Sequence, residues 1–197
     1  MKTLADAWIW YEATKRNLGR MQRLGRRHWG NPSLEGASIW LDDHFKTLEA
    51  SDIVEETTTS LKPIDDLAIV VLFSVFESHV RDHLVARIKP EATGLSEPIL
   101  KEAADDAIQG VEEGSFSRRV LYPLKEQRHV SAELVEKINQ VRKYRNWVAH
   151  GRREPVPDMS NVTPRVAYER LTEFLAVLGI ASEAEQIEPD ESGENPK

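Results

Sequence analysis

The sequence predicts an all-α protein, an antiparallel helical bundle of about five to seven helices. Apolar residues recur at spacings of three and four through most of the 197 residues, which is the period of an amphipathic helix. No run alternates steadily between apolar and polar residues, and no Asn-Gly or Asp-Gly hairpin turn occurs. A chain of this length that is 40% hydrophobic and 30% charged can bury a sizeable core.

The first 60 residues are predicted to form an N-terminal helical elaboration of this bundle. A helix is expected over residues 3–28, although Gly19 and Gly25 each weaken it by up to about 1 kcal/mol relative to alanine. A shorter helix is expected over residues 36–50, and the polar residues 55–60 are expected to form a connection.

The bundle itself is predicted to span residues 61–181. Its clearest helix covers residues 63–88, because Pro63 suits a first turn and Pro90 and Gly94 suit an end. Further helices, each flanked by a capping residue, a proline or a glycine, are expected over residues 97–109 (with Ser96 as N-cap and Gly110 as C-cap), 115–121, 131–150 and 164–178. Residues 182–197 are acidic and nearly free of large apolar groups, which predicts a disordered tail.

Composition excludes several classes of protein. The chain has no cysteine, so disulfide scaffolds, thiolate catalysis and zinc–thiolate sites are ruled out. Its longest apolar run is far shorter than the roughly 20 residues that span a bilayer, and its N-terminus does not resemble a signal peptide. We therefore expect a cytoplasmic protein with no membrane partner.

Charge is distributed unevenly along the chain. The net charge is −7, but residues 13–34 and 137–153 contain six basic residues each and no acid. Local patches decide what a surface attracts, so two basic segments are compatible with a nucleic-acid partner. In the first segment, the spacings of four, three and four place a stripe of arginines on one helix face: Arg16, Arg20, Arg23 and Arg27.

The predicted helix at residues 131–150 contains the candidate site. Arg145 occupies one position of its apolar stripe, whose other members are Leu134, Ile138, Val141 and Val148. A buried guanidinium without a partner is costly, so Arg145 should have a partner or line a cleft. Asn146 follows it and lies four residues before His150, at the helix end, where an imidazole can exchange a proton near neutral pH. Further cations lie close in sequence: Lys143, Arg152 and Arg153.

These residue types suit a phosphodiester. Arginine can neutralise the charge that builds on the non-bridging oxygens, and histidine can move a proton to or from the attacking or leaving oxygen. When the phosphodiester belongs to RNA, the adjacent 2′-hydroxyl can act as the nucleophile, so the reaction requires no metal or other cofactor.

The segment 144–151, Tyr-Arg-Asn-Trp-Val-Ala-His-Gly, resembles the Arg-polar-x3-His motif of the HEPN superfamily, all-helical proteins that include metal-independent endoribonucleases. The segment 73–81, Phe-Ser-Val-Phe-Glu-Ser-His-Val-Arg, is similar to the Phe-Glu central helix of several HEPN groups. The resemblance covers about residues 60–180. An Arg-x4-His spacing alone is weak evidence for the family, since Arg23 and His28 share it. The resemblance depends on the residues that surround Arg145 and His150.

The resemblance implies a homodimer in which two such motifs form one composite cleft. Arg145 and His150 would then be catalytic, Asn146 would orient or contact substrate, and products would carry 2′,3′-cyclic phosphate and 5′-hydroxyl ends. The resemblance also implies a toxin or antiviral effector that acts on RNA and is controlled by an antitoxin or another regulatory partner. In some HEPN toxins a tyrosine two residues after the histidine accepts AMP. Arg152 holds that position here, which puts such control in doubt.

Two other features of the central helix need an explanation. Glu77 shares a stripe with apolar residues, so it is expected to be partly buried with Arg145 as its natural partner; alternatively, it reaches solvent at a helix edge. His79 and His83 have the i,i+4 spacing that can present two imidazoles to one metal, but no third ligand is implied, and polar packing is the simpler interpretation.

Alternative functions remain open at this stage. The chain could be a catalytically inactive HEPN-like module for nucleotide or RNA binding or for dimerisation. It could also be an all-α adaptor whose basic segments bind an acidic partner. The arginine stripe of residues 16–27, with tryptophans as stacking faces, could follow an RNA backbone, or it could be a solvated face that binds the chain's own acidic tail.

Overall fold

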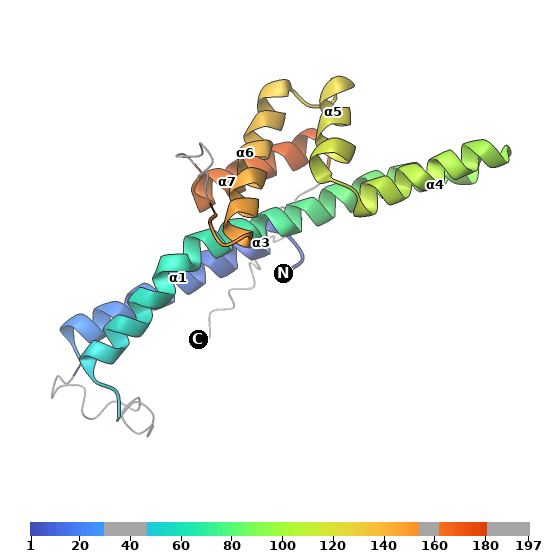
Figure 1. The fold of residues 1–197 in the computed structure, drawn as a ribbon. Coiled ribbons are helices and arrows are strands. Elements are labelled where there is room, and N and C mark those ends of the chain that lie inside the picture. The colour runs from blue at the N-terminus through green and yellow to red at the C-terminus, as the bar shows by residue number, and fades with distance from the viewer. Residues whose placement is uncertain (30–46, 154–161, 181–197) are drawn as a thin grey trace, which may run out of the picture.

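The computed structural model describes residues 1–29, 47–153 and 162–180, and every regular element in those ranges is a helix (Figure 1). The all-α prediction is therefore confirmed. The predicted helix at 36–50 falls largely outside the described residues, as does the predicted acidic tail at 182–197. Helix α1, Leu4–Arg27, agrees with the prediction and begins with a capping box between Thr3 and Asp6.

Helix α3, Ala50–Thr93, is the longest described helix, and most of the other helices pack against it. Its 44 residues extend for about 66 Å at 1.5 Å per residue. The predicted connection at residues 55–60 and the predicted start at Pro63 are wrong, because the helix continues through both. Thr57 and Thr58 satisfy their hydroxyls on the carbonyls of Ile53 and Val54, at 2.6 Å each, so the polar run fits inside the helix.

Packing against α1 explains why Pro63 does not break α3. Proline lacks one backbone donor, but α1 lies along the first half of α3 and buries Ile64 and Ala68 against Tyr11. Both proline-containing stretches remain helical: α3 also passes Pro90, where an end was predicted, and stops at Gly94.

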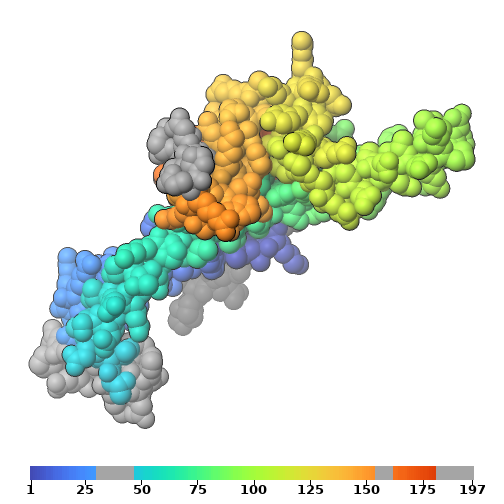
Figure 2. Space-filling model, viewed as in Figure 1, coloured from blue at the N-terminus to red at the C-terminus, as the bar shows by residue number. Residues whose placement is uncertain are grey.

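The two ends of α3 form antiparallel pairs (Figure 1). Gln22 of α1 contacts Thr58, and Lys2 contacts His79, so α1 runs opposite to α3. At the other end, α4, Pro98–Glu113, folds back along α3. The predicted caps of α4 are wrong, since Glu97 is the N-cap and the helix passes Gly110 to end at Gly114. The two pairs give the elongated outline in Figure 2.

The remaining helices gather on the middle of α3 (Figure 1). A π-helical turn, Ser117–Leu121, leads into α5, Tyr122–Glu126, where a short helix over residues 115–121 was expected. Helix α6, Ala132–Ala149, is capped by Ser131, and α7, Pro164–Val177, by Thr163; both helices lie where the sequence predicted them.

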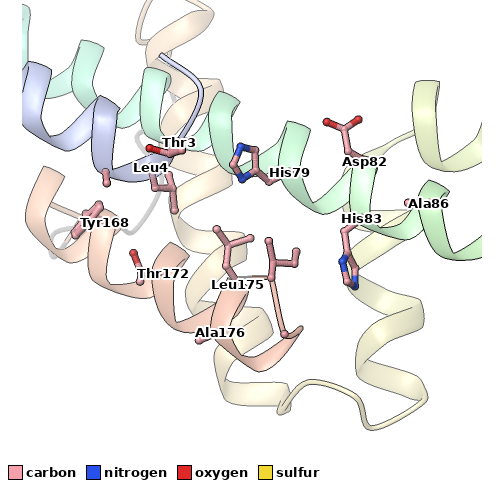
Figure 3. A pocket seen from close by; sticks show the side chains of 13 residues that line it. Thr3, Leu4, His79, Asp82, His83, Ala86, Tyr168, Thr172, Leu175 and Ala176 are labelled. Atoms are coloured by element: carbon pink, nitrogen blue, oxygen red, sulfur yellow. The ribbon is translucent and has the colours of Figure 1, made fainter. Parts of the chain in front are cut away.

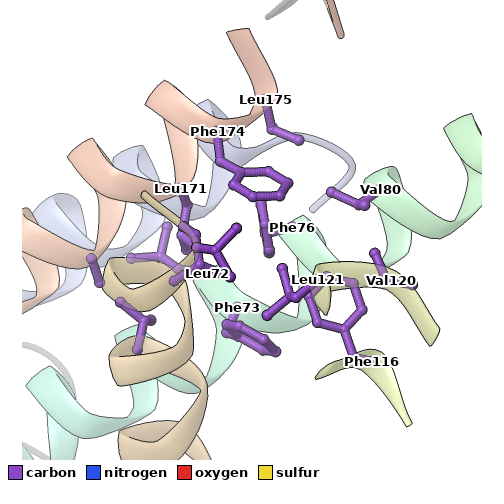
Figure 4. Close-up of a cluster of buried hydrophobic side chains, with 14 of the residues drawn as sticks. Leu72, Phe73, Phe76, Val80, Phe116, Val120, Leu121, Leu171, Phe174 and Leu175 are labelled. Atoms are coloured by element: carbon purple, nitrogen blue, oxygen red, sulfur yellow. The ribbon is translucent and has the colours of Figure 1, made fainter. Parts of the chain in front are cut away.

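The core lies where these helices meet the middle of α3. Its most deeply buried side chains include an aromatic cluster in which Phe76 contacts Phe73, Phe116 and Phe174 at ring-centroid distances of 5.4–5.8 Å (Figure 4). Leu4 and Ala7 of α1 belong to the same core, and the predicted division at residues 60 and 61 falls inside α3.

Candidate active site

The C-terminal end of α6 is shaped by two residues in the left-handed region. His150 is the C-cap, and its backbone N–H donates to Asn146 O at 2.9 Å. Gly151 has φ +75° and Arg152 has φ +57°, and the N–H of Arg152 reaches back to Trp147 O at 2.8 Å. The glycine supplies the first of these turns without strain, so α6 ends at Ala149 with His150 as its C-cap, one residue before the predicted end.

Arg145 is held in a partly buried position against α3. Its guanidinium carbon lies 5.5 Å from the centroid of the Phe73 ring, and its side chain is 30% exposed. Nη1 donates to Asn146 Oδ1 at 3.0 Å, and Nη2 lies 3.6 Å from Glu77 Oε2. The buried Nε has no hydrogen-bond partner among the described residues. The predicted pairing of Glu77 with Arg145 is confirmed.

Glu77 has a second arginine partner. Arg81 donates to Glu77 Oε1 from Nη2 at 2.5 Å and from Nε at 3.1 Å. The same guanidinium caps the end of α4, where it donates to the carbonyls of Val111, Glu112 and Gly114. Arg81 was not predicted, although its i,i+4 spacing from Glu77 was a visible signal. Glu77 therefore links α3, α4 and α6 through two guanidinium groups.

His150 is exposed and is not joined to Arg145 by a hydrogen bond within the described ranges. Arg145 contacts both Asn146 and Glu77, while the imidazole lies at the helix end, one turn beyond Asn146. The arrangement offers a held guanidinium and an accessible imidazole at one helix end, rather than a closed set of hydrogen-bonded groups.

Arg152 is anchored to a buried acid. Its guanidinium pairs with Asp66 of α3, which is 7% exposed, and lies over the Trp147 ring at 5.3 Å. Tyr144 donates to the other oxygen of Asp66 at 2.6 Å. Burial, with the negative charge of Asp65 nearby, raises the pKa of Tyr144. Asp66 was not predicted as a site residue.

The other predicted cations near α6 are exposed. Lys143 lies 3.8 Å from Glu136, and both side chains are about half exposed. Arg153 is exposed directly after Arg152. Neither contacts Arg145 within the part of the chain that the structure describes.

The arginine stripe on α1 faces solvent. Arg16, Arg20, Arg23 and Arg27 are all exposed, whereas the opposite face of α1 buries Leu4, Ala7 and Tyr11.

The stripe begins near the α6 end. Lys15, next to Arg16, binds Asp65 at 2.7 Å, and Tyr11 donates to the same carboxylate at 2.8 Å. Asp65 and Asp66 are consecutive in α3, so Lys15 and the turn after α6 bind neighbouring residues of that helix.

Among the described residues, the two histidines of α3 do not form a metal site with a third side chain. His79 Nε2 lies 2.6 Å from Lys2 O, so it joins α3 to the start of α1. No group of three or more histidine, aspartate or glutamate side chains that could hold a metal occurs within residues 1–29, 47–153 and 162–180.

Comparisons with known proteins give no match to this chain among protein-family models, curated proteins or solved structures. Among the described helices, none is long and apolar enough to pass through a bilayer.

Proposed function

We propose that the chain is a metal-independent endoribonuclease of the HEPN type, with Arg145, Asn146 and His150 at its active site. The observation that supports this proposal best is the position of Arg145. Its guanidinium is fixed between Glu77 and Asn146, over an aromatic ring, next to a helix end that presents an exposed histidine. A guanidinium fixed before substrate arrives needs little reorganisation during the reaction.

The proposed reaction is a transesterification within RNA. The 2′-oxygen attacks the adjacent phosphorus, the bond from phosphorus to the 5′-oxygen breaks, and the products end in a 2′,3′-cyclic phosphate and a 5′-hydroxyl. Arg145 stabilises the charge on the non-bridging oxygens, while His150 takes the proton from the 2′-hydroxyl or gives one to the leaving 5′-oxygen. Asn146 orients Arg145 or the substrate, and Glu77 is a positioning residue behind Arg145.

The proposed active form is a homodimer. Within one protomer, the C-terminal end of α6 leaves His150 exposed and without a hydrogen bond to Arg145 among the described residues. In a composite cleft, the α6 end of the second protomer would lie opposite this one. RNA would follow the exposed stripe of Arg16, Arg20, Arg23 and Arg27, with Lys143 and Arg153 nearer the reacting phosphate and Arg152 holding the turn after α6. We place this activity in the cytoplasm, as that of a toxin or antiviral effector under an antitoxin or regulatory partner.

The test is RNA cleavage in the presence of EDTA by the full chain and by Arg145→Ala and His150→Ala. We expect cleavage by the wild type to persist in EDTA, to yield cyclic phosphate ends, and to fall by at least about 100-fold in each variant. His129→Ala and Arg118→Ala, which alter exposed residues outside the site, are matched controls with unchanged cleavage.

Two outcomes would contradict the proposal. Cleavage that disappears in EDTA would indicate metal-dependent chemistry. Cleavage that is the same in both site variants as in the controls would move the site elsewhere. RNA binding without cleavage in any sample would favour the second candidate, an inactive RNA-binding or dimerisation module. The observation that favours that candidate is that, among the described residues, the exposed His150 forms no hydrogen bond with Arg145.

A further inference from the structure

Two hollows of similar size lie along α3. The first, of about 660 Å³, lies between the start of α1, α3 and α7 (Figure 3). Two of its polar side chains already have partners, because His79 contacts Lys2 O and Asp82 accepts from Ser78. The second, of about 560 Å³, lies where the C-terminal part of α3 meets α4, α5 and the end of α7. Both volumes are in the range of small-molecule sites in proteins.

The second hollow, called the aliphatic groove from here on, has branched apolar walls. Among the described residues that line it there is no phenylalanine, tyrosine or tryptophan, and its apolar side chains include Leu84, Ile88, Val111, Val120, Leu124 and Val177. Val111, Val120 and Leu124 belong to the hydrophobic core, whereas Val177 is 50% exposed. The groove therefore presents apolar surface to water beside the core, and an aliphatic group that covers this surface would be favoured.

Cations outnumber acids at the aliphatic groove. Arg87 of α3 and Arg119 of the π-helical turn line it, against one carboxylate among the described residues, that of Glu91. Neither guanidinium has a hydrogen bond or an ion pair within residues 1–29, 47–153 and 162–180. Arg119 also borders a shallow hollow on α4 that Asp106 and Glu113 line, so Arg87 is the cation most closely tied to the groove.

The segment that forms one wall of the groove is itself basic. Besides His129, residues 117–129 contain one acid, Glu126, and four exposed cations: Arg118, Arg119, Lys125 and Arg128. Cations gathered beside a groove raise the local concentration of anions. The charge around the groove therefore favours a ligand with negative charge.

The aliphatic groove is separate from the candidate active site. None of Arg145, Asn146 and His150 lines it. Leu84, the first α3 residue that lines it, comes seven residues after Glu77, which is about 10 Å along the helix. A ligand in the groove is therefore expected whether or not the chain cleaves RNA.

We propose that the aliphatic groove binds a free carboxylate that carries a flexible aliphatic chain. The chain covers the apolar walls between Leu84 and Val177, and the carboxylate pairs with the guanidinium of Arg87. A guanidinium suits this role, because its fork of N–H donors matches the two oxygens of a carboxylate. Glu91 opposes the negative charge of the ligand, so its removal should strengthen binding.

The probes are octanoate and octanol, which share an aliphatic chain and differ in charge. NMR titration of the methyl-labelled full chain should shift the signals of Leu84, Ile88 and Val177, with a dissociation constant for octanoate on the order of 1 mM. Octanol should bind at least about threefold more weakly. Decanoate should bind up to about tenfold more tightly than octanoate, because it buries two further methylene groups.

Variants of the charged residues test the pairing. Arg87→Gln should weaken binding of octanoate by about threefold or more, and Glu91→Gln should strengthen it by about twofold, while neither changes the affinity for octanol. Arg118→Gln is the matched control, since Arg118 is exposed next to Arg119 but does not line the groove. All three positions are exposed, so thermal unfolding should show that the fold is retained.

Weaker binding of octanoate in Arg87→Gln, with Arg118→Gln like the wild type, supports the proposal. It is overturned if octanoate shifts no methyl signal of the groove at about 10 mM, if octanol binds equally well, or if Arg87→Gln binds octanoate like the control. Methyl signals of the groove that shift on dilution of the protein alone, and not with octanoate, would also overturn it, because they would assign the groove to a second copy of the chain.

Discussion

Asp66 and Arg152 form an ion pair that fastens the turn after α6 to the middle of α3. The carboxylate is nearly buried, whereas the guanidinium is half exposed and lies over Trp147. His150 lies two residues before Arg152, so the pair fixes where the candidate catalytic histidine leaves the helix. The remaining oxygen of Asp66 accepts from Tyr144, which completes the anchoring of the α6 end.

Arg152→Ala should lower the free energy of unfolding by about 1–3 kcal/mol, because it leaves a buried carboxylate with Tyr144 as its side-chain partner. The loss is smaller than for a fully buried pair, since Arg152 is half exposed. Urea denaturation measures it, and Arg153→Ala, an exposed neighbour, should change stability by less than about 0.5 kcal/mol. Purely additive effects of Arg152→Ala and Asp66→Asn in a double-mutant cycle would contradict the coupling.

Glu77→Gln should destabilise the fold by about 1–3 kcal/mol, because Arg81 and Arg145 would lose the carboxylate between them. Chemical denaturation checks this, and Glu136→Gln is the control, since its pair with Lys143 is exposed and should contribute less than about 1 kcal/mol. If RNA cleavage is detected, Glu77→Gln should also reduce it. Equal stability of the two variants would show that Glu77 does not hold the three helices together.

Local chemistry at helix ends made part of this structure predictable. Ser131 and Thr163 cap α6 and α7 with their own hydroxyls, and Gly151 ends α6, so these boundaries follow from a few adjacent residues. The pairing of Arg145 with Glu77 was predictable too, because each residue interrupts an apolar stripe with an opposite charge. An unpaired charge at such a position would be costly.

The length of α3 and the role of Asp66 depend on contacts between distant segments. The run at residues 55–60 and Pro63 look like a break, and α1, which packs against them, overrides that local preference. Asp66 looks like a charge at a helix start. Its partners Tyr144 and Arg152 are about 80 residues away in sequence, and only the crossing of α3 and α6 brings them together.

The two glycines inside α1 should respond in opposite ways to substitution. Gly19 has open space, with its nearest neighbour, Arg23 Nη1, 3.7 Å from an added Cβ, so Gly19→Ala should raise stability by up to about 1 kcal/mol. Gly25 is packed on α3, where an added Cβ lies 3.0 Å from Ile53 and 3.1 Å from Val54. Gly25→Leu should therefore destabilise by about 1–3 kcal/mol. Thermal unfolding distinguishes the two, and stabilisation by both would argue against close packing of α1 on α3.

RNA affinity should depend on the arginine stripe of α1. Replacing Arg16, Arg20, Arg23 and Arg27 with glutamine should weaken binding at about 0.1 M salt and reduce the slope of log affinity against log salt by up to about 3. Fluorescence anisotropy with a labelled single-stranded RNA measures both quantities. Arg118 and Arg128, also exposed, serve as a control pair whose replacement should leave the slope unchanged. Binding that ignores salt, or a stripe variant that behaves like the control, would exclude the stripe as the RNA track.

Stability should fall in mild acid because of His83. Burial and the charge of Arg87 lower its pKa below the ordinary value of 6.5, so the unfolded chain takes up a proton at a higher pH than the folded chain does. The contribution of the neutral imidazole is therefore complete above about pH 6.5 and is lost as the pH falls toward the folded-state pKa. Between about pH 7 and pH 5, thermal unfolding should shift less in His83→Gln than in the wild type. His129→Gln controls for the loss of a histidine at an exposed position, and equal pH profiles for all three proteins would show that His83 keeps an ordinary pKa in the folded chain.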